Sequence, residues 1–331
     1  MTMASKRALI TGVTGQDGSY LAEHLLSLDY EVHGTIRTTS SDTAWSRIAH
    51  LVRGDRPQLL LHAADLGDSH SLIRLIAKIE PHEVYNLAAQ AHVRASFDQP
   101  VHTGDITGLG VVRLLEAIRA TDPTIRFYQA SSSEMFGSTP APQNEDTPFH
   151  PRSPYGVAKV YAYWATINAR EAYGLHASNG ILFNHESPRR GREFVTRKIT
   201  DGIARLLKGE ISVLRLGNLD TCRDWGHARD YVAAMHLMLR QDEPVDLVIG
   251  TGESRSVREF LDAAFAVVNL DWRDHVEIDS ILYRPAEVNE LRADATQARK
   301  LLGWEPHTSF AELVEEMVCA DLTAHGVAKK P

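Results

Sequence analysis

The chain has 331 residues, of which 43% are hydrophobic and 24% charged, and its formal net charge is −8. This length predicts two domains, or one large domain with an appended lobe, and the apolar content excludes an intrinsically disordered chain. The acidic balance argues against nucleic acid or an anionic membrane as the main partner, because both favour a basic surface.

Cysteine, histidine and apolar patterning set further limits. The two cysteines, Cys222 and Cys319, are too few for a disulfide framework, which suits a reducing compartment. The sixteen histidines are scattered rather than spaced as ligands, so no metal site is expected. Nowhere do about 18 apolar residues run together, and the apolar stretch near the N-terminus is too short for a signal peptide. We therefore expect a soluble, cytoplasmic protein.

Short apolar runs alternate with helical patterns in the first half of the chain. A longer helix follows from Ser153, with Pro154 in its first turn and Gly174 at its end. Strands that alternate with helices predict an α/β fold with a doubly wound, parallel, Rossmann-type sheet. The predicted strands are 7–11, 30–36, 59–62, 83–87, 126–130 and 176–183, and shorter helices start near residues 18, 69 and 103.

The pattern from residue 194 onward is less regular and predicts a smaller mixed α/β lobe. We therefore divide the chain into a first domain over 1–183 and a lobe, predominantly over 184–331, although such lobes often return to the main sheet. Segments 137–152 and 184–193 are rich in Pro, Arg, Ser and Asn and are predicted to be loops at the mouth of the sheet. In this part the predicted helices are 195–207, 228–240, 256–268 and 309–320, and the predicted strands are 212–216 and 246–249.

A glycine-rich turn lies between the first predicted strand and the first predicted helix. Glycine permits a tight turn and close backbone approach, while a helix N-terminus offers free N–H groups and positive potential to a pyrophosphate. The alternative is an ordinary glycine-rich turn, but strand and helix flank the motif correctly, so a dinucleotide cofactor is predicted. The cofactor-binding residues predicted here are Gly12, Thr14, Gly15, Gln16, Asp17 and Gly18.

The end of the second strand indicates which dinucleotide is bound. An NAD site usually places Asp or Glu there, whereas this strand ends at Arg37, with no acid until Asp42. A guanidinium beside hydroxyls suits a ribose phosphate and favours NADP; the alternative is a solvated arginine. Further candidates for the adenine edge and the cofactor wall are Asp65, Leu66, Leu87, Ala88, Ala89 and Gln90.

Tyr155 and Lys159 place a phenol and an ammonium one helical turn apart on the same face. A free phenol has a pKa near 10, but a lysine cation and a positively charged nicotinamide would lower that pKa into a useful range for a base. The alternative is a surface tyrosine beside a solvated lysine. The position of the pair after five predicted strands favours catalysis.

Ser132 and Glu134 follow the fifth predicted strand, at the edge where open α/β sheets bind ligands. The hydroxyl could hydrogen-bond the substrate alcohol that Tyr155 deprotonates. An alcohol–ketone oxidoreductase needs no carboxylate there, whereas removal of a proton next to a new carbonyl needs a second acid/base. A glutamate that caps a helix or faces solvent is an equally open interpretation from local sequence.

Longer sequence blocks carry a resemblance to a known family. Together with the glycine turn and the Tyr155–Lys159 pair, these blocks resemble the GDP-mannose 4,6-dehydratase family of the extended short-chain dehydrogenase/reductase superfamily. The resemblance runs from about residue 6 to 322. The blocks are 127–131, 134–137, 151–155, 183–191, 195–199, 223–227 and 284–288.

The resemblance implies a role for each matching residue. It implies loss of water from a GDP-sugar by an internal hydride transfer, with tightly bound NADP that is regenerated in each turnover. Arginine and lysine are the natural partners of the diphosphate. The implied catalytic residues are Ser132, Glu134, Tyr155 and Lys159; His185 and Arg190 would join Tyr155 and Lys159 at the cofactor; Ser132, Asn184, Lys198, Arg223, Arg284 and Glu287 would bind the substrate.

The chain departs from the family in two places. The family usually has threonine at Ser132, and a second arginine where this chain has Thr38, which weakens the NADP prediction without removing it. The resemblance also implies a homodimer or homotetramer in which residues 40–47, including Trp45, reach a neighbour's cofactor. The alternatives left open are a dehydratase of a related GDP-sugar such as a GDP-heptose, a nucleotide-sugar epimerase or reductase of the same superfamily, and a non-catalytic dinucleotide sensor.

Overall fold

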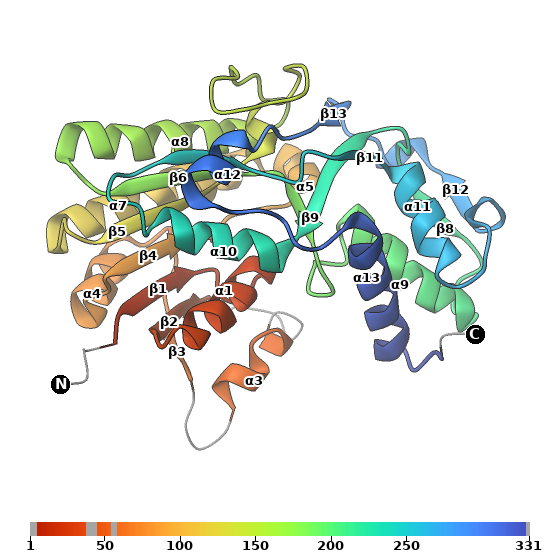
Figure 1. Ribbon diagram of the computed structural model, residues 1–331, viewed down its shortest axis with the longest axis horizontal. Coiled ribbons are helices and arrows are strands. Elements are labelled where there is room, and N and C mark those ends of the chain that lie inside the picture. The colour runs from red at the N-terminus through yellow and green to blue at the C-terminus, as the bar shows by residue number, and fades with distance from the viewer. Residues whose placement is uncertain (1–4, 38–44, 54–57, 329–331) are drawn as a thin grey trace.

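The computed structural model describes residues 5–37, 45–53 and 58–328 (Figure 1). Within these residues a seven-stranded sheet has the order β10-β6-β5-β4-β1-β2-β3, and every neighbouring pair is parallel. The predicted doubly wound parallel sheet is therefore confirmed. Its strands are β1 (Arg7–Thr11), β2 (Glu31–Ile36), β3 (Leu59–Ala63), β4 (Glu83–Asn86), β5 (Arg126–Ser132), β6 (Ala177–Leu182) and β10 (Asp246–Ile249).

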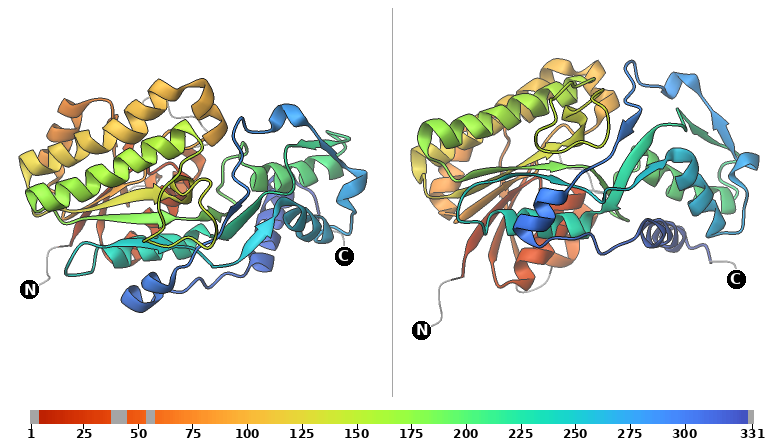
Figure 2. Two further views of the ribbon diagram at one scale, coloured as in Figure 1. Left: turned by 90° about the horizontal axis from the view of Figure 1, so that it is seen from above. Right: turned by 45° about the horizontal axis from the view of Figure 1, so that its top comes forward.

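Helices cover both faces of this sheet, and its central strands β1, β4 and β6 are buried on both sides. Within β1, Leu9 packs into one buried cluster, and its neighbours Ala8 and Ile10 pack into the other. The helices α4 (Ser69–Ile79), α7 (Gly110–Thr121) and α8 (Pro154–Tyr173) cover one face; α1 (Gln16–Ser27) and α10 (Ala228–Met238) cover the other (Figures 1 and 2). Short helices connect them: α3 (Ala49–Val52), α5 (Val93–Asp98), α6 (Pro100–Thr103), the π-helical turn η1 (Gly104–Leu109), η2 (Ser133–Met135) and α12 (Thr296–Leu302).

The long helix α8 has the boundaries that its capping residues predict. The Ser153 side chain accepts a hydrogen bond from Gly156 N at 3.0 Å, and Pro154 occupies the first helical position. Gly174 ends the helix with a φ of 68°, in the left-handed region that favours glycine. The helix thereby presents Tyr155 and Lys159 in its first two turns, next to the carboxyl end of β5.

A smaller lobe lies beyond the carboxyl ends of the main strands (Figure 1). Its apolar core holds Phe260, Trp225 and Met317, and a buried ion pair of Arg197 with Asp321 joins α9 to α13. Its helices are α9 (Val195–Leu207), α11 (Val257–Ala266) and α13 (Phe310–Ala324), with short turns η3 (Trp272–Asp274) and η4 (Ser280–Leu282). Its strands are β7 (Asn184–Glu186), β8 (Leu214–Leu216), β9 (Cys222–His227), β11 (Ser254–Ser256), β12 (Val276–Ile278) and β13 (Glu290–Leu291).

Two features differ from a simple division of the chain at residue 183. The prediction of a loop over 184–193 is wrong for β7, which pairs in parallel with β9 about 40 residues later; three residues are too few for a local strand signal. The strand β10 pairs with β6, so the main sheet also takes residues from beyond position 183. The division itself remains a proposal. In the described part of the chain, no helix is long and apolar enough to cross a membrane.

Candidate active site

A cavity of about 540 Å³ opens at the carboxyl ends of β1, β2 and β4. Gly12 has a φ of 71°, and a Cβ there would lie 3.0 Å from Ala88 Cα, so only glycine fits this approach of the turn to β4. The Thr11 hydroxyl accepts hydrogen bonds from the amides of Leu87 and Ala88, both at 3.1 Å, which fixes the opposite wall. This cradle fits a dinucleotide. Its lining includes Gly12, Thr14, Gly15, Arg37, Asp65, Leu66, Leu87, Ala88, Ala89 and Gln90.

Gly18 has a different function from the glycines that line the cavity. A Cβ at this position would lie 2.4 Å from the Gly12 carbonyl oxygen, so the glycine lets α1 pack closely against the turn. The helix begins at Gln16, two residues before the predicted start, and its N-cap residue, Gly15, has no side chain to cap the first amides. Those free amides suit a pyrophosphate.

A second cavity, of about 270 Å³, lies between the main sheet and the lobe. The structure brings to it five residues that are far apart in the sequence, supplied by β7, α9, β9 and the segment after η4. They are Asn184, Lys198, Arg223, Arg284 and Glu287, and these five are the residues predicted to hold substrate beside Ser132. Both cavities share His92, Glu193 and Phe194, which the sequence analysis missed, so the spaces adjoin.

The predicted catalytic side chains meet where β5 ends and α8 begins. Tyr155 is hydrogen-bonded to the Ser132 hydroxyl. The Lys159 Nζ lies 5.7 Å from the centre of the Tyr155 ring and donates a hydrogen bond of 2.5 Å to the Ala130 carbonyl. Glu134 lies in η2, where its amide donates to the Ser132 hydroxyl at 3.2 Å. The turn that ends β5 therefore sets the mutual position of hydroxyl and carboxylate.

The pKa values in this cluster follow from burial. Burial raises the pKa of Tyr155 to about 12, although the hydrogen bond from Ser132 lowers it. Burial lowers the pKa of Lys159 to about 8. In the chain alone, burial outweighs every other influence on the phenol, so the lowering of its pKa by Lys159 together with a bound nicotinamide stays a prediction.

Glu134 is kept ionised by two arginines. Its side chain is buried, and burial raises its pKa, but Arg284 and Arg223 together bring the pKa below its ordinary value. The Glu134 Oε1 atom lies 3.0 Å from Arg284 Nη1. A carboxylate in this form can accept a proton.

A buried ion pair joins α1 to β7. The Asp17 carboxylate lies 2.8 Å from His185 Nε2, while His185 Nδ1 lies 2.7 Å from the Phe183 carbonyl oxygen. Both partners can only accept, so both ring nitrogens donate and the imidazole is a cation. Burial raises the pKa of Asp17, but His185 and a hydrogen bond from Gln16 lower it to about 2, and Asp17 in turn raises the pKa of His185.

This pair predicts a pH-dependent stability. Because the pKa of Asp17 is lowered on folding, its carboxylate stabilises the fold above pH 3.8, and this stabilisation is lost as the pH falls through about 2. Because the pKa of His185 is raised on folding, its cation stabilises the fold fully below pH 6.5, and this stabilisation is lost as the pH rises through the pKa of His185 in the folded protein. Replacing His185 with Gln leaves a buried carboxylate unpaired and should cost about 3–5 kcal/mol of unfolding free energy near pH 6. Urea unfolding should show a smaller loss near pH 9.

The control is His50→Gln, which removes an exposed pair with Glu23 at 2.6 Å. Such surface pairs contribute about 0–1 kcal/mol, so its loss should be small at both pH values. An equal loss at pH 6 and pH 9 for His185→Gln would contradict the charged pair.

Several predicted cofactor residues thus contact one another rather than line the cofactor cavity. Gln16, Asp17 and His185 form one hydrogen-bonded group. Arg190 lies 3.0 Å from Glu186, has its guanidinium 3.7 Å from the centre of the Phe194 ring, and lines the second cavity. Their contact with cofactor remains a prediction.

Arg47 is a cavity residue that the sequence analysis did not single out. Its Nη1 donates to the Thr14 carbonyl at 3.0 Å, and the side chain lines the cofactor cavity of its own chain. Trp45 packs against the main core of its own subunit. Two of the sequence predictions concern positions outside the described residues. One is Thr38, where the family usually has a second arginine, and the other is residues 40–44, most of the segment expected to reach a neighbour's cofactor.

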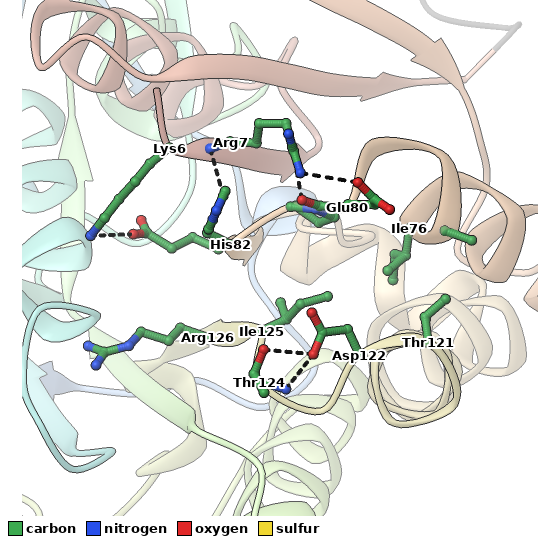
Figure 3. A pocket seen from close by; sticks show the side chains of 13 residues that line it. Lys6, Arg7, Ile76, Glu80, His82, Thr121, Asp122, Thr124, Ile125 and Arg126 are labelled. Carbon is green, nitrogen blue, oxygen red and sulfur yellow. Dashed lines mark hydrogen bonds and ion pairs between the residues drawn. The ribbon is translucent and has the colours of Figure 1, made fainter. Parts of the chain in front are cut away.

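Another pocket, of about 700 Å³, lies at the opposite, amino-terminal edge of the sheet (Figure 3). Two of its cations face carboxylates: Arg7 pairs with Glu80 at 3.4 Å, and Lys6 lies 3.9 Å from Glu83. The Asp122 carboxylate accepts from Thr124. None of the predicted site residues lines this pocket, so we place the active site at the carboxyl edge.

Comparison with known proteins agrees with this geometry. The model of the protein family described as GDP-mannose 4,6 dehydratase matches residues 9–317. The chain belongs to the GDP-mannose 4,6-dehydratase family. It is 54% identical to GDP-mannose 4,6 dehydratase 1 of Arabidopsis thaliana over 325 residues, which cover 96% of this chain and 90% of the relative.

Two further comparisons extend the family assignment. The chain is 50% identical to the GDP-mannose 4,6 dehydratase of Homo sapiens over 339 aligned residues, covering 95% of this chain and 91% of the relative. Among solved structures, the dTDP-glucose 4,6-dehydratase DesIV from Streptomyces venezuelae, solved with NAD bound, superposes with a TM-score of 0.85. It is 22% identical and covers 97% of this chain and 98% of its own, so this likeness concerns the fold alone.

Proposed function

We propose that this protein is a hydro-lyase that converts GDP-mannose to GDP-4-keto-6-deoxymannose by an internal hydride transfer with loss of water. The family membership supports this reaction. The observation that carries it is the placement of Glu134 beside Ser132 and Tyr155, with Arg284, which lines the second cavity, 3.0 Å from the Glu134 carboxylate. An epimerase or reductase has no need of that carboxylate.

Tyr155 is the base for the sugar 4-hydroxyl in this proposal. Ser132, already hydrogen-bonded to the phenol, holds the same alcohol in place. When bound, the nicotinamide cofactor would supply a hydride acceptor for carbon 4 and a hydride donor for carbon 6. Tyr155 gives the proton that it took from the 4-hydroxyl back to carbon 5 when carbon 6 is reduced, so electrons and protons balance within one turnover. Lys159, fixed by the Ala130 carbonyl, supplies a positive charge beneath the ring that favours the phenolate.

Glu134 performs the dehydration itself. The new 4-ketone acidifies the hydrogen at carbon 5, and the ionised Glu134 removes that proton. The same proton passes to the departing carbon-6 hydroxyl, which leaves as water, so the carboxylate is regenerated. Lys198, Arg223 and Arg284, which line the second cavity, would hold the diphosphate.

NADP is the cofactor that the cavity favours. Arg37 is exposed at the end of β2 and lines the cavity, in the place where an NAD site usually carries an acid. Arg47 adds a second cation near the glycine turn. Denaturing the purified protein and identifying the released nucleotide by mass spectrometry tests this choice, and release of NAD alone would contradict it.

Mass spectrometry of product mixtures tests the reaction. Incubation of the purified protein with GDP-mannose, without added cofactor, should give the loss of one water, whereas dTDP- and UDP-sugars should remain unchanged. If only a GDP-heptose lost water, the substrate would be a GDP-heptose and not GDP-mannose. Conversion that requires added NADPH would instead assign a reductase.

A homodimer through α8 is the assembly we propose. Val157, Tyr161 and Trp164 are 49–56% exposed and lie three to four residues apart, so they form one apolar stripe on α8; Leu109, on the neighbouring η1, is 44% exposed. A second copy of the same surface would cover this stripe. The protein would function in the cytoplasm, where its two free cysteines are compatible with a reducing environment.

A charge in this stripe should separate the subunits. Replacing Trp164 with Glu is expected to give monomers in analytical ultracentrifugation, because a carboxylate cannot be buried unpaired in an apolar interface. The matched control is Leu301→Glu, at a residue that is 53% exposed on α12. If the Trp164→Glu variant sediments in the same way as the unchanged protein, the interface lies elsewhere.

A further inference from the structure

Arg284 contacts the substrate cavity and Glu134 at the same time. Its side chain is 29% exposed and lines the cavity, while its Nη1 atom lies 3.0 Å from the nearly inaccessible Glu134 Oε1. The two residues are 150 positions apart in the chain. One guanidinium therefore joins the cavity for the diphosphate to the carboxylate that moves the proton.

Arg223, the other arginine that faces Glu134, is held differently. Its Nη1 donates to the backbone carbonyls of Cys222 at 2.8 Å and Val288 at 2.9 Å, and the side chain is buried. These bonds to the backbone keep Arg223 in place. The Arg284 guanidinium donates a hydrogen bond to the Glu134 carboxylate, and it could donate to another anion instead.

We propose that Arg284 is exchanged between Glu134 and the substrate diphosphate, so that Glu134 is released to move a proton only when a nucleotide occupies the cavity. This inference rests on the proposed function. A phosphate oxygen is a strong acceptor for a guanidinium, and the partly exposed Arg284 side chain lines the cavity in which the diphosphate would bind. Before substrate arrives, the contact with Arg284 keeps the buried Glu134 carboxylate paired.

The exchange has a definite electrostatic consequence. The charged and titratable groups that act on Glu134 are Arg284, Arg223 and Tyr155, and Glu287 acts on Arg284 from its own loop. Removal of the Arg284 contact leaves burial, which raises the carboxyl pKa, opposed by Arg223 alone. The carboxyl is then a stronger base for the carbon-5 proton and a better carrier of it to the hydroxyl.

The test is a titration of Glu134 in the full-length protein with its cofactor, by carbon-13 NMR of glutamate-labelled protein. The Glu134 signal is assigned as the one lost in Glu134→Gln. Saturating GDP, with binding verified by calorimetry, should raise the midpoint of this signal by about one pH unit or more, the size of effect that one lost charge partner produces. Inorganic pyrophosphate should act in the same direction, whereas guanosine should leave the midpoint unchanged.

Two variants separate the exchange from a general effect of the phosphate charge. In Arg284→Gln the midpoint should already be raised without ligand, and saturating GDP should shift it little. The control Arg292→Gln, which removes a partly exposed arginine 3.5 Å from Glu290, should respond as the unchanged protein does. A full shift in Arg284→Gln, or no shift in the unchanged protein with GDP bound, overturns the exchange.

The titration requires no turnover, so it is independent of the test of the reaction. A shift with GDP in a protein that leaves GDP-mannose intact would retain the exchange and refute the proposed function. Dehydration of GDP-mannose without any shift of the Glu134 midpoint would support the proposed function and refute the exchange.

Discussion

Replacing Glu134 with Gln should lower formation of the 4-keto-6-deoxy product by roughly 10²–10⁴-fold, the usual contribution of one general acid/base. The amide has the same shape but cannot accept the carbon-5 proton. Oxidation at carbon 4 uses Tyr155, Ser132 and Lys159 but not Glu134, so it should continue. The near-ultraviolet absorbance of reduced nicotinamide should therefore appear after GDP-mannose is added and then persist.

The appropriate control is Glu290→Gln, a conservative change of an exposed glutamate on β13. It should leave both the absorbance and the product unchanged. Normal water loss in Glu134→Gln would refute the role of this carboxylate and would restore the interpretation of Glu134 as a capping residue. That interpretation is the one that local sequence left equally open.

Replacing Tyr155 with Phe should stop the reaction one step earlier. Without the phenol, no group removes the proton of the 4-hydroxyl, and product formation should fall by roughly 10²–10⁴-fold. The absorbance of reduced nicotinamide should not appear at all, which distinguishes this variant from Glu134→Gln. Stopped-flow absorbance after mixing with GDP-mannose measures this difference.

Tyr161→Phe is the matched control, because Tyr161 lies on the same helix but is 49% exposed. It should retain full activity. If Tyr155→Phe still reduced the cofactor at the normal rate, another group would be the base, and Lys159, with its pKa lowered to about 8, would be the first candidate.

Local signals were sufficient for most of the main domain. The strand predicted over 7–11 is β1, and α8 begins and ends at the residues that cap it, since capping and periodicity act over a few residues. The three residues of β7 have no such signal; they form a strand only because β9 lies beside them.

The residues of the candidate site divide in the same way. The glycine turn and the Tyr155–Lys159 pair are local patterns, and the family blocks identified Lys198, Arg223 and Arg284 in the second cavity. Arg47, His92 and Phe194 carry no such pattern, because each meets the cavity through a long-range contact. The resemblance also gave no warning that burial raises the Tyr155 pKa, since desolvation depends on what surrounds a side chain.

By itself the amino-acid sequence determined the parallel α/β architecture, the dinucleotide turn and the family, because each depends on residue types at short, regular spacings. Only the tertiary structure decided which charges meet: Asp17 with His185, and Glu134 with Arg284. Pairs of this kind join positions far apart in the chain, and their energies depend on burial and on distances of a few ångströms. Neither quantity is written in the order of the residues.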